Sequence, residues 1–130
     1  MNTNTKFLVV DDFSEMREHI KSLLQEIGFC HIHEAEDGNV ALDKLQAENF
    51  DFIVSNWQMP KMDVLAMLQN IRANEALKEI PVLMVTADAK KRNVLAAAQA
   101  GANGYLVRPF SAAILHDKLS LIFKNISNQS

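Results

Sequence analysis

Five short apolar runs alternate along the chain with longer stretches in which apolar residues recur every three or four positions. Strands that alternate with amphipathic helices in this way indicate βαβ units on a parallel sheet. The pattern therefore predicts an α/β fold, a doubly wound five-stranded parallel sheet with helices on both faces. The expected strands are 7–10, 31–34, 52–55, 82–86 and 104–107, and the expected helices are 14–27, 39–48, 64–74, 90–100 and a last helix that starts at Ser111.

The periodicity also predicts which helical side chains are buried and how the first helix begins and ends. We expect Ser14 to cap the start of the first helix and Gly28 to follow its end. In the helix at 64–74, the stripe expected to be buried comprises Leu65, Leu68 and Ile71. On the last helix, Ile114, Lys118 and Leu121 lie on a stripe offset from the buried one, so two large apolar side chains should be exposed.

The composition limits the class of protein. A chain of 130 residues with 48% hydrophobic and 22% charged positions fits one globular domain, so we expect residues 1–130 to form a single domain without a separate output domain. The net charge of −3 argues against a nucleic-acid partner. No apolar run reaches the ~20 residues of a spanning helix, which argues against membrane insertion. A single cysteine, Cys30, and the absence of a signal-peptide pattern favour a cytoplasmic location.

Polar residues follow four of the predicted strands. Asp11 and Asp12 follow the first, Asn56 the third, Thr86 ends the fourth and Arg108 follows the fifth. Because parallel strands end at the same edge of a sheet, we expect these side chains to converge. Two adjacent carboxylates at a buried strand end require a cation or a basic side chain between them. Magnesium, which prefers oxygen ligands, is one such cation.

Six motifs in fixed order extend this interpretation: LVVDDFSEMR, EAEDG, SNWQMPKMD, LMVTADAKK, AAAQAGANGY and VRPF. From Lys6 to about Ile126 the chain resembles the receiver domains of two-component response regulators, and among them the stand-alone, CheY-like chemotaxis receivers. The resemblance implies a flavodoxin-like (βα)5 receiver fold with strand order 2-1-3-4-5, and a role in phosphorelay and chemotaxis signal transduction.

The resemblance also implies roles for the strand-end residues. In this family a histidine kinase phosphorylates an aspartate after the third strand, and magnesium binds beside it. The matching metal ligands are Asp11, Asp12, the acceptor position Asn56 and the backbone carbonyl of Gln58; the switch residues are Thr86 and Tyr105; and Arg108-Pro109 matches a Lys-Pro pair that usually has a cis peptide bond.

Three positions depart from the family pattern. Asn56 replaces the acceptor aspartate, and an amide cannot form an acyl phosphate by in-line attack. With one carboxylate fewer, magnesium should bind weakly or not at all. Arg108 replaces the lysine, and its guanidinium pairs with carboxylates through a planar fork, so we expect it to bond Asp11 or Asp12 and to occupy part of the metal and phosphate space. Val64 stands where the family commonly has glycine.

Asn56 has three interpretations. It is natural, which makes the chain a pseudo-receiver that acts by phosphorylation-independent protein binding; or it is an engineered substitution in a magnesium-dependent phosphoacceptor; or Ser55 takes the phosphate instead. Strand alternation points Ser55 away from Asn56, which argues against the third. Arg108 and Val64 favour the first, because an engineered acceptor variant would keep its neighbours at family identity.

The expected output is protein binding and not enzyme activity, since no nucleophile and base pair, Walker loop or cofactor fingerprint is present. The resemblance implies a histidine kinase, a flagellar switch component or a phosphatase as partner, and a monomer or weak dimer. Trp57, beside the site, should report its occupancy by fluorescence. The residues expected to form the partner-binding face are Ala89, Lys91, Val94, Ala98, Ala102, Tyr105, Val107, Ile114, Lys118 and Leu121.

Overall fold

The computed structural model describes residues 3–57, 64–87 and 91–128, with the side chains of 91–93 and 127–128 excepted. Every predicted strand and helix is present, and no observed bound differs from the predicted one by more than one residue. The strands are β1 (Lys6–Val10), β2 (His31–Ala35), β3 (Phe52–Asn56), β4 (Val82–Thr86) and β5 (Gly104–Val107). The helices are α1 (Ser14–Ile27), α2 (Gly38–Ala47), α3 (Val64–Ala73), α4 (Lys91–Gln99) and α5 (Ala112–Asn128).

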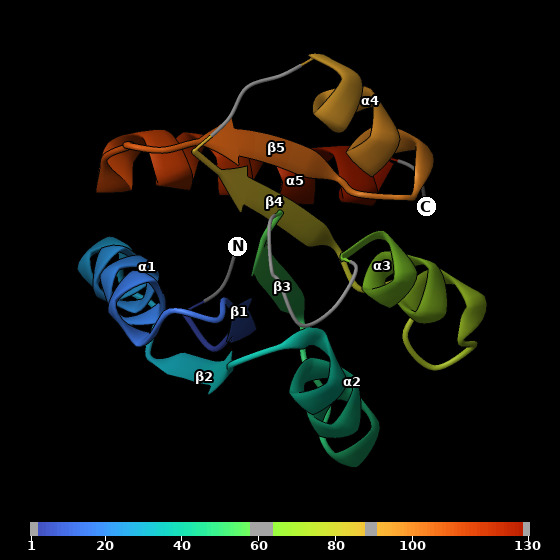
Figure 1. Cartoon of the computed structure of the whole chain (residues 1–130). Coiled ribbons are helices and arrows are strands. Elements are labelled where there is room, and N and C mark those ends of the chain that lie inside the picture. The colour runs from blue at the N-terminus through green and yellow to red at the C-terminus, as the bar shows by residue number, and fades with distance from the viewer. Residues whose placement is uncertain (1–2, 58–63, 88–90, 129–130) are drawn as a thin grey trace.

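The sheet has the order β2-β1-β3-β4-β5, and all four strand pairs are parallel (Figure 1). This is the order that the family resemblance implies, and the α/β prediction is confirmed. β1, β3 and β4 have neighbours on both sides and read as unbroken apolar runs, as strands covered on both faces must. β2, the polar strand, lies at an edge of the sheet, as its composition predicts.

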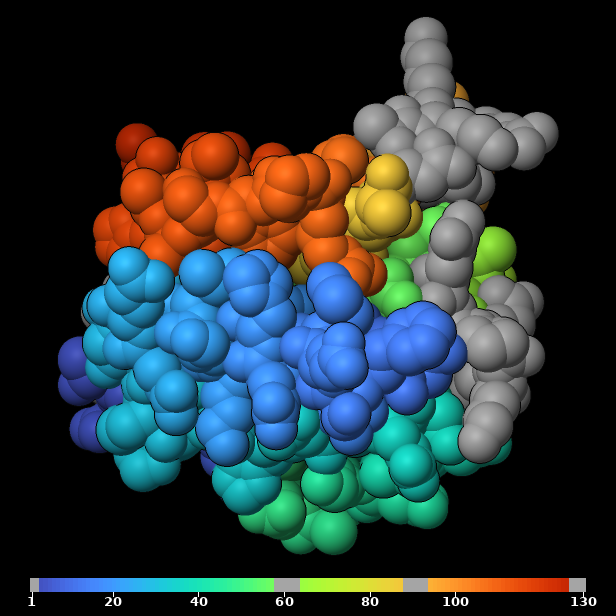
Figure 2. Space-filling model, turned by 60° about the vertical axis from the view of Figure 1, so that its left-hand side comes forward, coloured from blue at the N-terminus to red at the C-terminus, as the bar shows by residue number. Residues whose placement is uncertain are grey.

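Two apolar clusters cover the two faces of the sheet. Alternate residues of β1 separate between them: Phe7 and Val9 pack with α1 and α5, whereas Leu8 and Val10 pack with α2, α3 and α4. Figure 2 shows α1 and the start of α5 side by side over one face. No helix within the described residues is long and apolar enough to cross a membrane.

The start of α1 differs from the prediction. Phe13, not Ser14, is the N-cap residue, with φ −99° and ψ 121°, and its side chain makes no capping bond. The Phe13 N–H instead donates to Asp11 Oδ1 at 3.0 Å, so the first acidic residue fixes the turn that leads into the helix. At the other end, Gly28 is the C-cap as predicted, and its φ of +124° explains why glycine is used there.

The buried stripe of α3 is also shifted from the prediction. Leu68 and Ile71 are buried, but Leu65 is only half-buried. Val64 and Met67 take its place in the core, because positions i, i+3, i+4 and i+7 counted from Val64 form one face of a helix. The β-branched residue that departs from the family pattern therefore serves as a core residue here.

Candidate functional site

The polar residues at the carboxyl ends of the strands do converge. Asp11, Asn56 and Thr86 are 0%, 7% and 1% exposed, so all three side chains are enclosed by the rim of the sheet. The register places the ends of β1, β3, β4 and β5 side by side, with Val10 opposite Ser55 and Thr86 opposite Val107. In Figure 2 the blue, green, yellow and orange segments meet at one place on the surface.

Arg108 connects three of these strands. Its Nη2 lies 3.7 Å from Asp11 Oδ2 and donates a hydrogen bond to Asn56 Oδ1 at 3.1 Å. Its backbone N–H donates to the Thr86 carbonyl at 2.7 Å, and the Arg108-Pro109 peptide bond is cis, as the resemblance implies. The expected ion pair with the acidic pair is therefore present, and Asp11 is the partner.

Three hydrogen bonds fix the main chain and one carboxylate oxygen of Asp11. Its N–H donates to the Ala35 carbonyl at 3.1 Å, its Oδ1 accepts from Phe13, and its own carbonyl accepts from Arg17 Nη1 at 2.7 Å. Burial raises the pKa of its carboxyl, and the neighbouring carboxyl of Asp12 raises it further. The Phe13 N–H and the charge of Arg108 oppose this shift of the pKa. The site thus holds a carboxylate at the cost of its hydration, and Arg108 compensates part of that cost.

Three buried polar atoms among the described residues lack a hydrogen-bond partner: Asp11 Oδ2, Asp12 Oδ1 and Arg108 Nε. The two carboxylate oxygens suit a hard divalent cation such as Mg²⁺, which prefers oxygen ligands. The third expected side-chain ligand, Asn56 Oδ1, already accepts a bond from Arg108. The acidic pair therefore fits a metal ion, while the guanidinium competes for the same oxygens. Gln58, the fourth expected ligand, lies outside the described residues.

The other expected site residues surround this cluster. Ser55 follows strand alternation, so its side chain leaves β3 on the face opposite to Asn56, and its Oγ donates to the Asn56 backbone carbonyl at 3.1 Å. Tyr105 is half-buried, and its ring lies 6.3 Å from the ring of Trp57 at an interplanar angle of 62°. This edge-to-face pair links the aromatic residue of β5 to the residue that follows Asn56.

The described residues of the expected partner-binding face lie on α4, β5, α5 and the turn between α4 and β5, and β5 contacts both helices. Ile114 and Leu121 are each 51% exposed, which confirms the prediction for the last helix. Leu95 on α4, which was not predicted from the sequence, is also 51% exposed. We call this surface the output face; its described members are Val94, Leu95, Ala98, Ala102, Tyr105, Val107, Ile114, Lys118 and Leu121. Of the other two expected members, Ala89 and the side chain of Lys91 lie outside the described residues.

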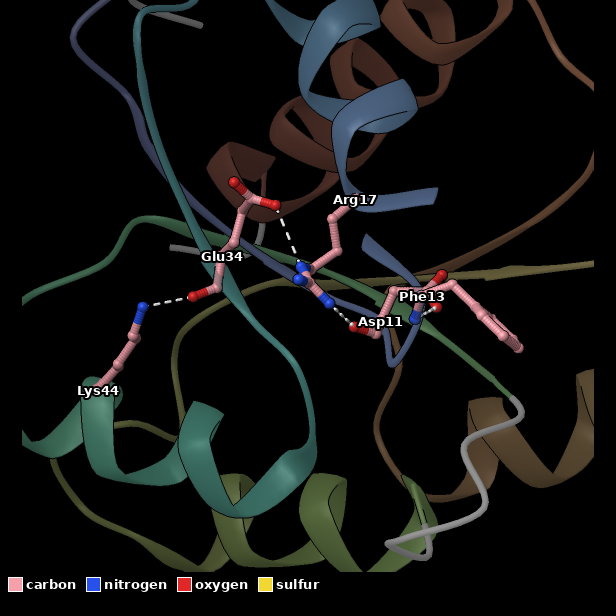
Figure 3. Close-up of polar contacts among 5 residues, drawn as sticks. All are labelled: Asp11, Phe13, Arg17, Glu34 and Lys44. Carbon is pink, nitrogen blue, oxygen red and sulfur yellow. Dashed lines mark hydrogen bonds and ion pairs between the residues drawn. The ribbon is translucent and has the colours of Figure 1, made fainter. Parts of the chain in front are cut away.

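A second group of polar residues was not predicted from the sequence. It lies beside the turn of Asp11, Asp12 and Phe13, which we call the acidic turn. The group comprises Arg17 of α1, Glu34 of β2 and Lys44 of α2 (Figure 3). Arg17 donates to the Asp11 carbonyl and to the Glu34 carboxylate, and Lys44 donates to the Glu34 carbonyl. In sequence Arg17 is one of several charged residues on α1, and nothing in its spacing distinguishes it from a solvated one. Only the pairing of β2 with β1 brings Glu34 within its reach.

Comparison with known proteins identifies a family match and close relatives of this chain. Residues 7–120 match the family described as the response regulator receiver domain. The chain is 52% identical over 126 residues to chemotaxis protein CheY-3 of Vibrio cholerae, covering 97% of each chain. It is 51% identical over 122 residues to chemotaxis protein CheY of Pseudomonas aeruginosa, covering 94% of this chain and 98% of the relative.

Solved structures agree. Chemotaxis response regulator CheY4 of Vibrio cholerae superposes with a TM-score of 0.83 at 32% identity, over 92% of this chain and 98% of that one. Response regulator TrrA of Thermotoga maritima, solved in complex with Mg²⁺ and BeF, gives a TM-score of 0.79 at 32% identity, over 91% and 98% of the two chains. With the parallel sheet, the acidic rim and these relatives together, the chain belongs to the response regulator receiver domain family, as a CheY-like chemotaxis receiver.

Proposed function

We propose that this chain is a pseudo-receiver: it acts in chemotaxis or a related phosphorelay by binding a protein partner, independently of its own phosphorylation. The proposal rests on one observation. Asn56 lies at the end of β3, where the family resemblance places the acceptor, and its Oδ1 accepts a hydrogen bond from Arg108 Nη2 at 3.1 Å. An amide at this position is a poor nucleophile, and its only side-chain oxygen is already engaged by a cation.

Arg108 supplies the site with a permanent positive charge. The guanidinium lies 3.7 Å from the Asp11 carboxylate, so the acidic rim is partly neutralised without a bound ion. The same side chain ties the end of β5 to β1 and β3. We infer that the conformation of β5 is set by this internal contact and not by a phosphoryl group.

Magnesium binding is weakened for the same reason. When bound to a receiver, Mg²⁺ neutralises charge on the phosphoryl oxygens. Here Asp11 and Asp12 would hold it, with the Asn56 oxygen as a neutral third ligand. The Arg108 guanidinium already uses one lone pair of Asn56 Oδ1 and lies 3.7 Å from Asp11 Oδ2, so a second cation at this place meets its positive charge. This competition lowers the affinity for Mg²⁺ relative to a site with three carboxylates and a lysine.

The output face supplies the binding surface. Leu95, Ile114 and Leu121 each expose about half of their surface, and Lys118 lies along α5 between the two exposed large apolar residues of that helix. Exposed apolar side chains beside a basic residue are common at protein interfaces. We propose a cytoplasmic histidine kinase, flagellar switch component or phosphatase as the partner, bound by a monomer or a weak dimer, without catalysis by this chain.

Incubation with a small-molecule phosphodonor and Mg²⁺, followed by intact mass and peptide mapping, tests the loss of the acceptor. We expect no phosphorylation of the natural chain and phosphorylation at position 56 in Asn56→Asp, with a change in Trp57 emission. Phosphate on Ser55 in the natural chain would overturn the proposal. Partner binding that appears only in phosphorylated Asn56→Asp would support the alternative, an acceptor removed by substitution.

A pull-down against candidate partners tests the output face. The double variant Ile114→Ser, Leu121→Lys should lose partner binding while its circular dichroism and unfolding midpoint stay unchanged, because both side chains are exposed. Phe13→Ser is the matched control, since Phe13 is 64% exposed but lies on the α1 side of the molecule. Equal binding by all three proteins would contradict the assignment of this face.

A further inference from the structure

We propose that Arg17 is a positioning residue for the acidic turn: it holds the main chain of Asp11 in the place where its carboxylate can face a cation. Among the described residues, the hydrogen bonds of the Arg17 guanidinium go to the Glu34 carboxylate and to the backbone carbonyl of Asp11. It acts through the Asp11 carbonyl, which accepts from its Nη1 at 2.7 Å (Figure 3). This inference does not depend on whether the chain can be phosphorylated.

The guanidinium is fixed by a second bond. Its Nε donates to Glu34 Oε1 at 3.1 Å, and the Arg17 side chain is only 16% exposed. A partly buried, charge-assisted pair of this kind is stronger than a neutral hydrogen bond and resists rotation of the side chain. Arg17 therefore bridges β2 and the end of β1 through two different N–H groups, Nε and Nη1, of one planar guanidinium.

Glu34 is itself anchored. Its backbone is part of the β1–β2 ladder, opposite Val9, and its carbonyl accepts from Lys44 Nζ of α2. The contacts thus run from α2 through β2 and α1 to the acidic turn. In Figure 3 the Arg17 side chain reaches down from α1 between Glu34 and Asp11, with no other drawn side chain between them.

The turn needs such support because the two carboxylate oxygens of Asp11 lie in different surroundings. Its Oδ1 is used by the Phe13 N–H, and its Oδ2 is buried beside Arg108 and the carboxyl of Asp12. Repulsion between the two acids favours rotation of the turn toward solvent. The bond from Arg17 to the carbonyl opposes this rotation without neutralising the carboxylate.

The sign of one effect separates positioning from electrostatics. Removing a positive charge near a cation site should strengthen cation binding if Arg17 acts only by its charge. If Arg17 positions the turn, Arg17→Ala should weaken binding, by about tenfold, as loss of an outer partner of metal ligands typically does. Glu34→Gln keeps an acceptor oxygen for Arg17, so positioning predicts nearly unchanged affinity, whereas an effect of charge alone predicts weaker binding.

The experiment uses two readouts on the full chain. Amide hydrogen exchange of Asp11 and Phe13 should accelerate in Arg17→Ala by more than the loss of global stability explains. Affinity for Mn²⁺, measured from the electron paramagnetic resonance of the free ion, is compared in the natural chain and in the Arg108→Met background, where competition by the guanidinium is absent. Arg17→Lys should give an intermediate result on both, because one ammonium cannot bridge two acceptors as a fork does.

The matched control is Lys6→Ala. Lys6 lies at the opposite end of β1 and makes an ion pair of similar length with Glu48, at 2.9 Å. It should lower stability slightly and change neither readout at the acidic turn. The inference is overturned if Arg17→Ala leaves exchange at Asp11 and Phe13 in proportion to global stability, or if it binds Mn²⁺ as tightly as its parent or more tightly. Should neither parent bind Mn²⁺, the exchange data alone decide.

Discussion

Replacing Arg108 by methionine removes the internal cation while keeping most of the volume of the side chain. The distance between the two charged groups gives the size of the expected loss in the free energy of unfolding. At 3.7 Å, the attraction between Arg108 and Asp11 is about 4 kcal/mol at an effective dielectric constant of about 20. Asp11 is fully buried, so its carboxylate cannot regain water when the guanidinium is lost. Breaking a buried pair from one side costs roughly 3–5 kcal/mol.

The expected loss is at the lower end of that range, about 3 kcal/mol at pH 7, because Asp11 keeps the hydrogen bond from Phe13. The cost should shrink as the pH falls toward 3.8, the ordinary pKa of Asp11, since a protonated carboxyl needs no cationic partner. It should also shrink when Mg²⁺ is added. An ion present at 100 times its dissociation constant stabilises the folded state by about 2.7 kcal/mol.

Urea unfolding with and without Mg²⁺ checks these expectations. The natural chain should gain little from Mg²⁺, and Arg108→Met should recover most of its lost stability. Lys6→Met is the control: it removes a partly exposed cation that is paired with Glu48, so it should cost at most about 1 kcal/mol and show no rescue by the ion. The reasoning fails if Mg²⁺ stabilises the natural chain and Arg108→Met equally, because the guanidinium then does not compete with the ion.

Two further predictions concern Asp11 and the glycines. Burial raises the pKa of Asp11 above 3.8 in the folded state, so the stability that protonated Asp11 contributes is complete below pH 3.8 and is lost as the pH rises through the raised pKa. The stability of Asp11→Asn relative to the natural chain should therefore increase with pH over this window and then level off. A difference that does not change with pH would contradict the shift. Gly28 and Gly101 both have positive φ, at +124° and +104°, so each change to alanine should cost about 1–2 kcal/mol from backbone strain alone. A Cβ on Gly101 would also lie 2.9 Å from Arg72 Cγ, whereas one on Gly28 meets nothing within 4 Å, so thermal unfolding should show the larger loss for Gly101→Ala.

The local pattern was sufficient for most of the fold. Buried parallel strands are continuous apolar runs, and their helices repeat at 3.6 residues, so both periods can be read without tertiary information. The errors were local too. Ser14 has the side chain of a cap, but Phe13 is the N-cap residue, and its N–H is bonded to Asp11. Leu65 fits a helical stripe as well as Met67 does, and only packing against the sheet decided between them.

The candidate site divides in the same way. Its residues could be predicted from sequence because parallel strands end at one edge, which brings Asp11, Asn56 and Arg108 together whatever the details of the loops. Which atoms meet could not be predicted. That Arg108 selects Asp11 over Asp12 depends on the direction of β5 relative to β1, and that Arg17 supports the turn depends on the pairing of β2 with β1.

The sequence by itself thus determined the architecture, the acidic rim and the presence of an amide, Asn56, at the end of β3, because these are properties of periodicity and of residue type. Only the tertiary structure decided that the Asn56 amide oxygen accepts a bond from Arg108, that the Asp11 carboxylate is buried, and that the main chain of Asp11 is fixed by contacts with α1 and β2. Those contacts join residues 6 to 97 positions apart, and their distances follow from the packing of the whole sheet and not from any local stretch of sequence.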